Sequence, residues 1–248
     1  MRWTATVSAE HMVNPGLRQG LARGDGGVGW VLSTNNALYR TDDDFVATAP
    51  PGDKLDPAIP DSLATKTYDH IGDIDIADGV LWAPIEKDDK ESGEQVLARY
   101  DARTLAFRDS FVVPQHHAAF VTIDSDGVLY SADEFGDDTL QRYRVVGASL
   151  EKLAPLEMSQ KVDRIQGGDI ASGAIWLSTD DDHDGLYRVD LATGQVQDVG
   201  AAGHADGEGE GDDAQPGPGD GVTLAVLAAD AKLVPMRVIT LIARPAAP

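Results

Sequence analysis

The chain has 248 residues, 42% of them hydrophobic and 25% charged, which is the composition of a folded protein with one large domain or two small ones. Its 42 acidic and 20 basic residues give a formal net charge of −22, which argues against nucleic acid and anionic membranes as partners. Because the chain contains no cysteine, disulfides, thiolate metal sites and a cysteine nucleophile are excluded.

The N-terminal residues lack the apolar core of a signal peptide, and no segment approaches the roughly 20 apolar residues that span a membrane. We therefore expect a cytoplasmic protein, or a secreted one if a leader has been removed. The acidity itself has two interpretations, which are a solvated surface and the binding of cations.

One strand pattern recurs five times along the chain. In each copy a short alternating segment, such as 71–76 or 120–124, precedes a glycine-led apolar segment, and a further apolar segment follows. Asp-Gly or Ser-Gly pairs at 78–79, 126–127 and 172–173 suit tight hairpins between the first two strands. The glycine-led segments end, at spacings of 52, 48, 46 and 48 residues, in Trp30, Trp82, Tyr130, Trp176 and Leu224.

This repeat predicts an all-β, five-bladed β-propeller of four-stranded antiparallel blades in a single domain, residues 1–248. Residues 1–8 are expected to close the ring as the outer strand of the last blade. A β-sandwich is the competing fold, but a sandwich would not repeat a whole set of strands five times. In chain order, the predicted blades span residues 16–66, 67–115, 116–162, 163–203 and 204–248.

The fifth repeat is irregular. Leu224 stands where the other copies have an aromatic residue, and the polar, glycine- and proline-rich segment 204–220 occupies the place of the inner strand. A mobile insertion and an irregular inner strand both fit this segment, and the sequence leaves the choice open.

Acidic residues recur at one position of the repeat. In a meander blade, the loop that enters the first strand and the hairpin between the second and third strands lie at the same end of the ring, around the channel mouth. The hairpins supply Glu86, Glu134 and Asp180, each four positions after its second-strand aromatic residue. Carboxylates gathered in this way repel one another, and hard oxygen ligands suit calcium or magnesium. We expect a divalent cation here, with calcium as the first candidate; the alternative is a structural network in which Arg18, Arg164 and histidines neutralise the acids.

The same end of the ring receives candidate catalytic groups. The entry loops carry His70, His117 and Arg164, and a histidine can act as general base because its ordinary pKa lies near neutrality. A loop histidine that only forms hydrogen bonds is the alternative. Asp75 and Asp169, on the inner strands, are expected deeper in the same channel.

Residues 180–185 have the D-x-D-x-D-G spacing of a calcium loop, but Leu191 stands where that loop needs a glutamate, and the surroundings are a hairpin. An exposed acidic turn is the favoured interpretation. The sequence also lacks a P-loop, a dinucleotide-binding fingerprint, a nucleophile elbow and a zinc-protease signature, which argues against phosphoryl transfer and serine hydrolase chemistry.

The Asp-Gly hairpins, the Gly-Val-Leu-Trp strand at 79–82 and the Leu-Tyr-Arg-Val-Asp-Leu-Ala-Thr-Gly segment at 186–194 are similar to those of bacterial β-propellers. That superfamily includes the gluconolactonase and senescence-marker lactonases and the quinoprotein-like repeats. In the lactonase-like members a calcium ion at the channel mouth polarises the substrate. The resemblance implies as ligands Glu86, Glu134 and Asp180, and as proton-transfer groups His70 or His117.

The number of repeats keeps a second enzyme class open. Those lactonases usually have six blades, whereas five-bladed propellers include glycosidases with separated carboxylates, a role that would suit Asp75, Glu134 and Asp169.

The first functional hypothesis is a small-molecule enzyme with a divalent-metal-assisted site at the channel mouth, either a lactonase-like or other hydrolase or an isomerase or cyclase. The alternative is a non-catalytic propeller that binds a ligand or a protein on the same face. The expected partner is a small-molecule substrate or ligand, and the oligomeric state is left open.

Overall fold

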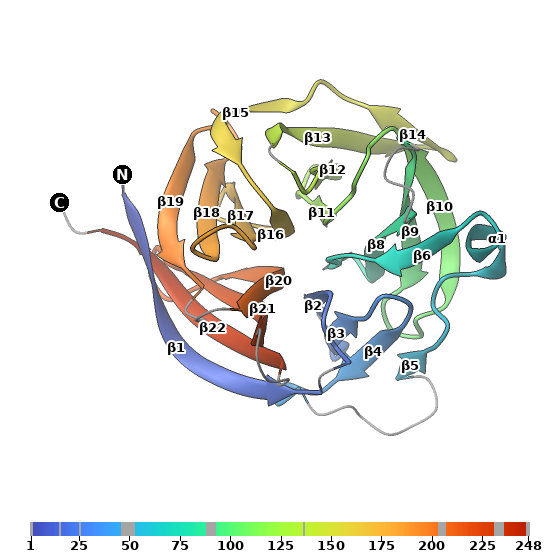
Figure 1. The fold of residues 1–248 in the computed structure, drawn as a ribbon, viewed down its shortest axis with the longest axis horizontal. Coiled ribbons are helices and arrows are strands. Elements are labelled where there is room, and N and C mark those ends of the chain that lie inside the picture. Colours follow the sequence, from blue (N-terminus) through green and yellow to red (C-terminus); the bar gives the residue numbers. More distant parts are fainter. Residues whose placement is uncertain are drawn as a thin grey trace.

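Five antiparallel sheets stand in a ring in the computed structural model of the protein (Figure 1). The structure describes residues 2–14, 16–24, 26–45, 53–87, 93–135, 137–202, 207–230 and 236–246. The sheets follow one another around the ring, and the predicted all-β, five-bladed propeller is therefore confirmed. No helix among these described residues has the length and apolar character needed to cross a membrane.

The first four blades are built from consecutive segments of the chain. The first contains β2 (Gly20–Gly24), β3 (Gly29–Ser33), β4 (Leu38–Thr41) and β5 (Lys54–Leu55). After the short helix α1 (Asp61–Ala64), the second contains β6 (Tyr68–Ile71), β7 (Asp75–Ala77), β8 (Val80–Lys87), β9 (Gln95–Asp101) and β10 (Phe107–Val113). The third contains β11 (Thr122–Ile123), β12 (Val128–Ser131), β13 (Asp137–Val146), β14 (Ser149–Lys152) and β15 (Leu156–Val162). The fourth contains β16 (Ile165–Ala171), β17 (Ala174–Thr179), β18 (Gly185–Asp190) and β19 (Val196–Ala201).

The fifth blade joins the two ends of the chain. Its strands are β20 (Gly207–Pro216), β21 (Val222–Asp230), β22 (Met236–Pro245) and β1 (Trp3–Val13). β1 pairs antiparallel with β22 and runs beside it along the rim of the ring (Figure 1), over a longer stretch than the residues 1–8 expected in this role. Residues 204–206 of segment 204–220 lie outside the described residues. From Gly207 on, the structure shows the irregular inner strand: β20 pairs with β21, and the register shifts between Gly209 and Asp212.

Pairs of an aromatic residue and an arginine recur across neighbouring strands in three blades. The pairs in register are Trp82 with Arg99, Tyr130 with Arg142, and Trp176 with Arg188. The Arg99 guanidinium lies 5.5 Å from the centre of the Trp82 ring, and Arg142 lies 5.5 Å from that of Tyr130. Such contacts contribute about 0.5–1 kcal/mol each at exposed sites, and the arginine stem shields the ring from water. The second-strand aromatic and the third-strand arginine therefore recur as a unit.

Trp3 anchors the closing strand to the fourth blade. Its ring is buried and meets the Trp176 ring edge to face, with 5.2 Å between their centres. The Arg188 guanidinium lies 5.3 Å from the Trp3 ring, and the Gln197 side chain donates a hydrogen bond to the Trp3 carbonyl at 3.2 Å. The N-terminal strand is thus held both by β22 and by the neighbouring blade.

The axis of the ring is filled by polar contacts around Asp73, which is 1% exposed. Its carboxylate accepts the N–H groups of Leu21 at 3.2 Å, Gly168 at 3.1 Å and Asp212 at 3.2 Å, from the first, fourth and fifth blades. Its own N–H donates to the carbonyl of Ala119 in the third blade at 2.9 Å. Asp73, in the second blade, therefore contacts all four other blades through its carboxylate and its N–H.

Candidate functional site

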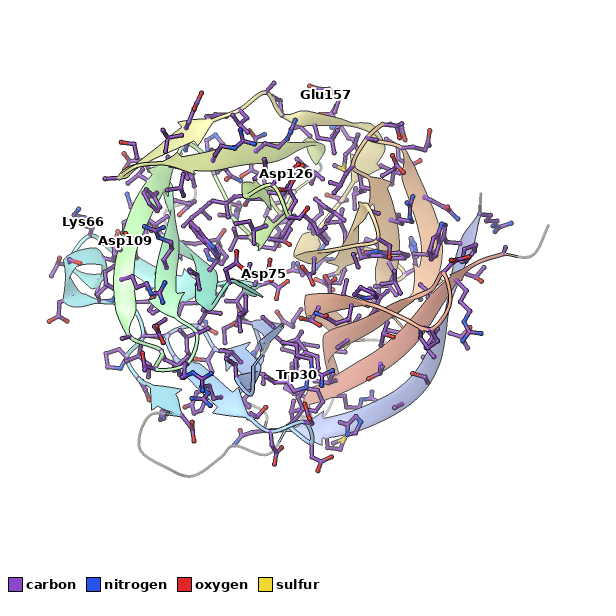
Figure 2. The ribbon with its side chains drawn as sticks, turned by 180° about the vertical axis from the view of Figure 1, so that it is seen from behind. Trp30, Lys66, Asp75, Asp109, Asp126 and Glu157 are labelled. Carbon is purple, nitrogen blue, oxygen red and sulfur yellow. The ribbon has the colours of Figure 1, made fainter. Side chains whose placement is uncertain are left out.

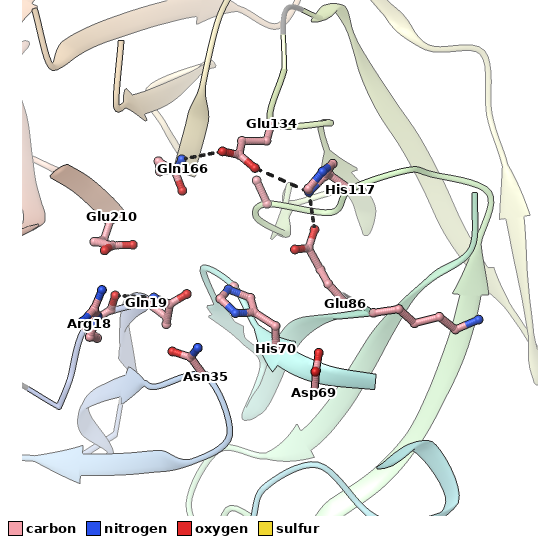
Figure 3. Close-up of a pocket in the computed structure, with 13 residues that line it drawn as sticks. Arg18, Gln19, Asn35, Asp69, His70, Glu86, His117, Glu134, Gln166 and Glu210 are labelled. Carbon is pink, nitrogen blue, oxygen red and sulfur yellow. Dashed lines mark hydrogen bonds and ion pairs between the residues drawn. The ribbon is translucent and has the colours of Figure 1, made fainter. Parts of the chain in front are cut away.

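A pocket of about 430 Å³ opens at one end of the ring (Figure 3). All five blades contribute to it, through the segments that lead into the inner strands and through the ends of the second strands. The lining residues are Arg18, Gln19, Asn35, Asp69, His70, Gly72, Glu86, Lys87, His117, Ala119, Glu134, Gln166 and Glu210. The pocket lies where the repeat predicted that these loops converge.

His117 lies between two carboxylates at the wall of the pocket. Its Nδ1 is 3.5 Å from Glu86 Oε1 and 3.6 Å from Glu134 Oε2, and Figure 3 shows the two glutamates approaching the ring from different sides. The His117 side chain is 7% exposed, against 13% for Glu86 and 19% for Glu134. An imidazole and two carboxylates are thus held together, mostly out of water.

The environment of Glu86 keeps its carboxylate ionised. Burial alone would raise the pKa of Glu86, but the hydrogen bonds from His117 and from the N–H of Ala118 outweigh it. The charges of His117 and His70 act in the same direction, and the net effect lowers the pKa below its usual value. Glu86 is therefore a fixed negative charge beside the imidazole at neutral pH.

Two neighbouring segments fix the positions of His117 and Glu134. The His117 N–H donates to Asp133 Oδ1 at 2.7 Å, which ties the two loops of the third blade together. The Gln166 side chain donates to Glu134 Oε1 at 3.2 Å, and the N–H of Ile165 donates to the Glu134 carbonyl at 3.0 Å. The fourth blade thus holds the loop that carries Glu134.

His70 and Arg18 also line the pocket, from the second and the first blade. His70 lies on β6, in register with Glu86 on β8, and its ring points into the pocket (Figure 3). Arg18 is exposed at the rim. Gln19 and Lys87, which also line the pocket, were not sequence candidates, although each follows one directly in the chain.

The structure does not bring Asp180 or Arg164 to this pocket. Arg164 forms an ion pair with the carboxylate of Asp180, and the Asp180 N–H donates to the Arg164 carbonyl at 2.9 Å. Within the described ranges, no group of three or more His, Asp or Glu side chains is arranged to hold a metal ion. The three predicted carboxylate ligands are thus not assembled together, and calcium binding stays a prediction.

Asp75 and Asp169 lie on inner strands, outside the pocket lining, and both are buried. The two carboxylates meet at the hydroxyl of Thr122. Glu134 lines the pocket whereas Asp75 and Asp169 do not, and the glycosidase alternative with its separated carboxylates stays a prediction.

The acidic turn at 180–185 is organised by Asp181. Its carboxylate accepts the N–H groups of His183 at 3.2 Å and Gly185 at 3.0 Å, and the hydroxyl of Tyr187 at 2.6 Å. These bonds cap the hairpin between β17 and β18 and leave Asp181 engaged with the chain itself, which agrees with the favoured interpretation as an acidic turn.

Comparisons with known proteins identify the fold. No family model matches the sequence, and a search of curated proteins finds no match. Among solved structures, a luciferin-regenerating enzyme is similar with a TM-score of 0.55 at 15% identity, over 90% of this chain and 75% of that one. Hydrazine synthase of Kuenenia stuttgartiensis has a TM-score of 0.52 at 11% identity, over 89% of this chain and 58% of that one. A chain of the mitotic checkpoint complex has a TM-score of 0.52 at 10% identity, over 91% of this chain and 67% of that one.

At such low identity these similarities show the fold alone. They confirm the propeller part of the resemblance stated from the sequence. They do not show membership of the gluconolactonase-like family.

Proposed function

We propose that the protein is a small-molecule hydrolase that opens lactones or related esters in the pocket at the end of the ring. The observation that carries the proposal is the His117 ring, held 3.5 Å from Glu86 and 3.6 Å from Glu134 in a pocket of about 430 Å³. Pockets of this size suit small organic molecules, and a histidine braced by carboxylates is a common acid–base unit.

The residues of the pocket can supply the proton transfers of such a reaction. As a water oxygen bonds to the lactone carbonyl carbon, His117 takes the proton of that water, and the charges of Glu86 and Glu134 stabilise the imidazolium that forms. As the ring C–O bond breaks, the same proton passes to the leaving oxygen. The product is a hydroxy acid, which ionises at neutral pH and releases one proton to the solvent.

Other lining groups suit the binding of a polar substrate. The Arg18 guanidinium and the Asn35 amide lie at the rim opposite His117 (Figure 3) and can hold oxygen atoms of the substrate. Phe135, which is 56% exposed, meets the His117 ring edge to face with 5.4 Å between centres, and offers an apolar surface beside the reacting groups. The fold of the luciferin-regenerating enzyme shows that an enzyme can be built on a similar propeller.

A proton-release assay tests this proposal. Purified protein is mixed with a panel of sugar lactones, aliphatic lactones and aryl esters in weak buffer with a pH indicator. We expect saturable release of acid from at least one class. Thermal stabilisation by a panel compound without acid release would favour the non-catalytic binding propeller instead, and neither effect with any compound would contradict a lactone site.

We further propose that this pocket binds calcium through the carboxylates of Glu86 and Glu134 and the side-chain amide oxygen of Gln166, which are all hard oxygen donors. Chelated protein titrated with calcium chloride in a calorimeter is expected to release or absorb heat and to unfold at a higher temperature. Glu134→Gln should weaken the binding about tenfold or more, because one charged ligand is lost. His183→Ala, outside the pocket, is the control, and absence of both heat and stabilisation in the unmodified protein would contradict calcium binding.

A further inference from the structure

One hydroxyl group lies between two buried carboxylates in the middle of the ring, where Figure 2 labels Asp75. Thr122 Oγ1 is 3.0 Å from Asp75 Oδ2 and 2.9 Å from Asp169 Oδ1. A hydroxyl has a single hydrogen and can donate to only one of these oxygens. The other contact is a hydrogen bond only if that carboxyl group carries a proton and donates it to Thr122.

Backbone N–H groups also donate to these two carboxyl groups, and they supply no positive charge. The N–H of Ile123 donates to Asp75 Oδ2 at 2.9 Å. The N–H groups of Ile170 and Ala214 donate to Asp169 Oδ1 and Oδ2, both at 2.7 Å. These bonds hold the carboxyl groups in place and by themselves lower the pKa of each, but burial outweighs them and the net direction for both groups is upward.

The charged groups nearby do not neutralise the pair. On β20, Asp213 adds a further carboxyl group, which accepts the N–H of Arg23 at 2.8 Å and the Gln215 side chain at 3.2 Å. The Arg23 guanidinium, on β2, is paired with Asp43 at 3.2 Å. Among the described residues, no lysine, arginine or histidine forms an ion pair with Asp75 or Asp169.

We propose that Asp75, Thr122 and Asp169 share one bound proton at neutral pH. These residues lie on β7, β11 and β16, so the shared proton joins the second, third and fourth blades. We call this hydrogen-bonded group of three residues the latch. In the latch, Asp169 donates its O–H to Thr122, and Thr122 donates its own hydrogen to Asp75. Without that proton, both carboxylates compete for one hydrogen, and like charges face each other across the axis.

The electrostatics of the pair agree with this geometry. Burial raises the pKa of Asp169 well above its usual range, and the charges of Asp75 and Asp213 raise it further. Burial likewise raises the pKa of Asp75, against the bonds from Ile123 and Thr122. Burial also brings the pKa of Asp213 to about 7. Asp169, which faces two other carboxyl groups, is the natural holder of the proton.

The stability that the latch gives to the folded protein should fall as the pH rises. An aspartate in the unfolded chain ionises near pH 4, whereas the latch keeps its proton to a higher pH, so the folded protein binds more protons between these limits. The stability that the latch contributes is fully present below about pH 4 and is lost as the pH rises through the raised pKa values. Rising pH should therefore weaken the contact between the three blades.

Urea unfolding at several pH values between 5 and 8 tests the latch. The dependence of the unfolding free energy on pH gives the number of protons released on unfolding. We expect Asp169→Asn to reduce this number by about one, whatever its effect on stability at a single pH. Asp126→Asn, in the exposed hairpin between β11 and β12, should leave the number unchanged. An equal slope for the unmodified protein and Asp169→Asn would overturn the proposal.

Infrared spectroscopy gives a reading that does not depend on the variants being stable. The folded protein at pH 7 should show the carbonyl absorption of protonated carboxyl groups, which shifts in heavy water and disappears on unfolding at the same pH. Asp212 and Asp213, whose pKa values burial raises to about 8 and about 7, contribute to this absorption beside the latch. Asp75→Asn serves as a second variant if Asp169→Asn does not fold, and should also change the slope. A folded protein without such a band at pH 7 would show that the pair holds no proton.

Discussion

His117→Ala is expected to reduce kcat/KM for a hydrolysed substrate by about 10²–10⁴-fold, the usual contribution of one positioned acid–base group. Among the lining residues, His117 is the group held between Glu86 and Glu134, so its removal leaves the two carboxylates without the imidazole that moves the proton. Steady-state kinetics by proton release, over a range of substrate concentrations, measure the loss. If the imidazole acts in the chemical step, the loss falls mainly on kcat.

The matched control is His183→Ala. His183 is the half-exposed histidine of the β17–β18 hairpin and does not line the pocket. Its replacement should leave both kinetic constants within about twofold. Circular dichroism and the urea midpoint of both variants show whether the ring remains folded. A loss below about tenfold for a well-folded His117→Ala protein would remove His117 from the reaction.

The sequence predicted the ring of blades because the same cross-strand pairing recurs from one blade to the next. Trp82 and Arg99 lie opposite each other in one blade, and Trp176 and Arg188 do so in another, so the spacing of these residues reports how the strands pair. Spacing also predicted which loops share one end of the ring. Glu86, on β8, reaches the pocket together with residues of every other blade.

The spacing of residues along the chain could not predict which groups each side chain contacts. Asp180 occupies the same repeat position as Glu86 and Glu134, yet its carboxylate bonds to Arg164 of its own blade. An aspartate is one methylene shorter than a glutamate, and a guanidinium from the neighbouring strand entry is within its reach. Counting along the chain places a backbone position at the channel mouth, whereas the direction of a side chain depends on the nearest opposite charge.

The sequence patterns left open whether the fifth inner strand forms, for a related reason. β20 contains Gly209, Gly211, Asp212 and Asp213, which lack the apolar alternation of an ordinary strand. Its contacts explain the composition. The N–H of Asp212 bonds to the carboxylate of Asp73, and Asp212 itself accepts the hydroxyl of Ser178 at 2.8 Å. A strand that lies against the polar axis needs aspartates for hydrogen bonding and glycines for the close approach of other strands. In a sequence, aspartates and glycines are also typical of a loop.

Asp73→Ala is expected to lower the free energy of unfolding by about 3–9 kcal/mol, because three buried N–H groups lose their acceptor and each costs about 1–3 kcal/mol when unpaired. The donors, in Leu21, Gly168 and Asp212, belong to three different blades. A change of this size is comparable with the whole stability of many domains. Urea unfolding at pH 6 measures it, and Asp126→Ala, on an exposed turn, should change the free energy by less than about 0.5 kcal/mol.

The contacts of the Asp73 carboxylate can also be disturbed from the fifth blade, by Gly211→Ala. A Cβ atom at this position would lie 2.1 Å from Asp73 Oδ1 and 2.6 Å from the Cα of Gly20, so two inner strands would have to move apart. The loss should therefore resemble that of Asp73→Ala, although Asp73 itself remains. Gly16→Ala is the control, because its nearest neighbour would be a side-chain oxygen at 3.5 Å. If both axis variants unfold within about 1 kcal/mol of the unmodified protein, the blades are held together by their apolar faces alone, and the carboxylate at the axis is not needed to close the ring.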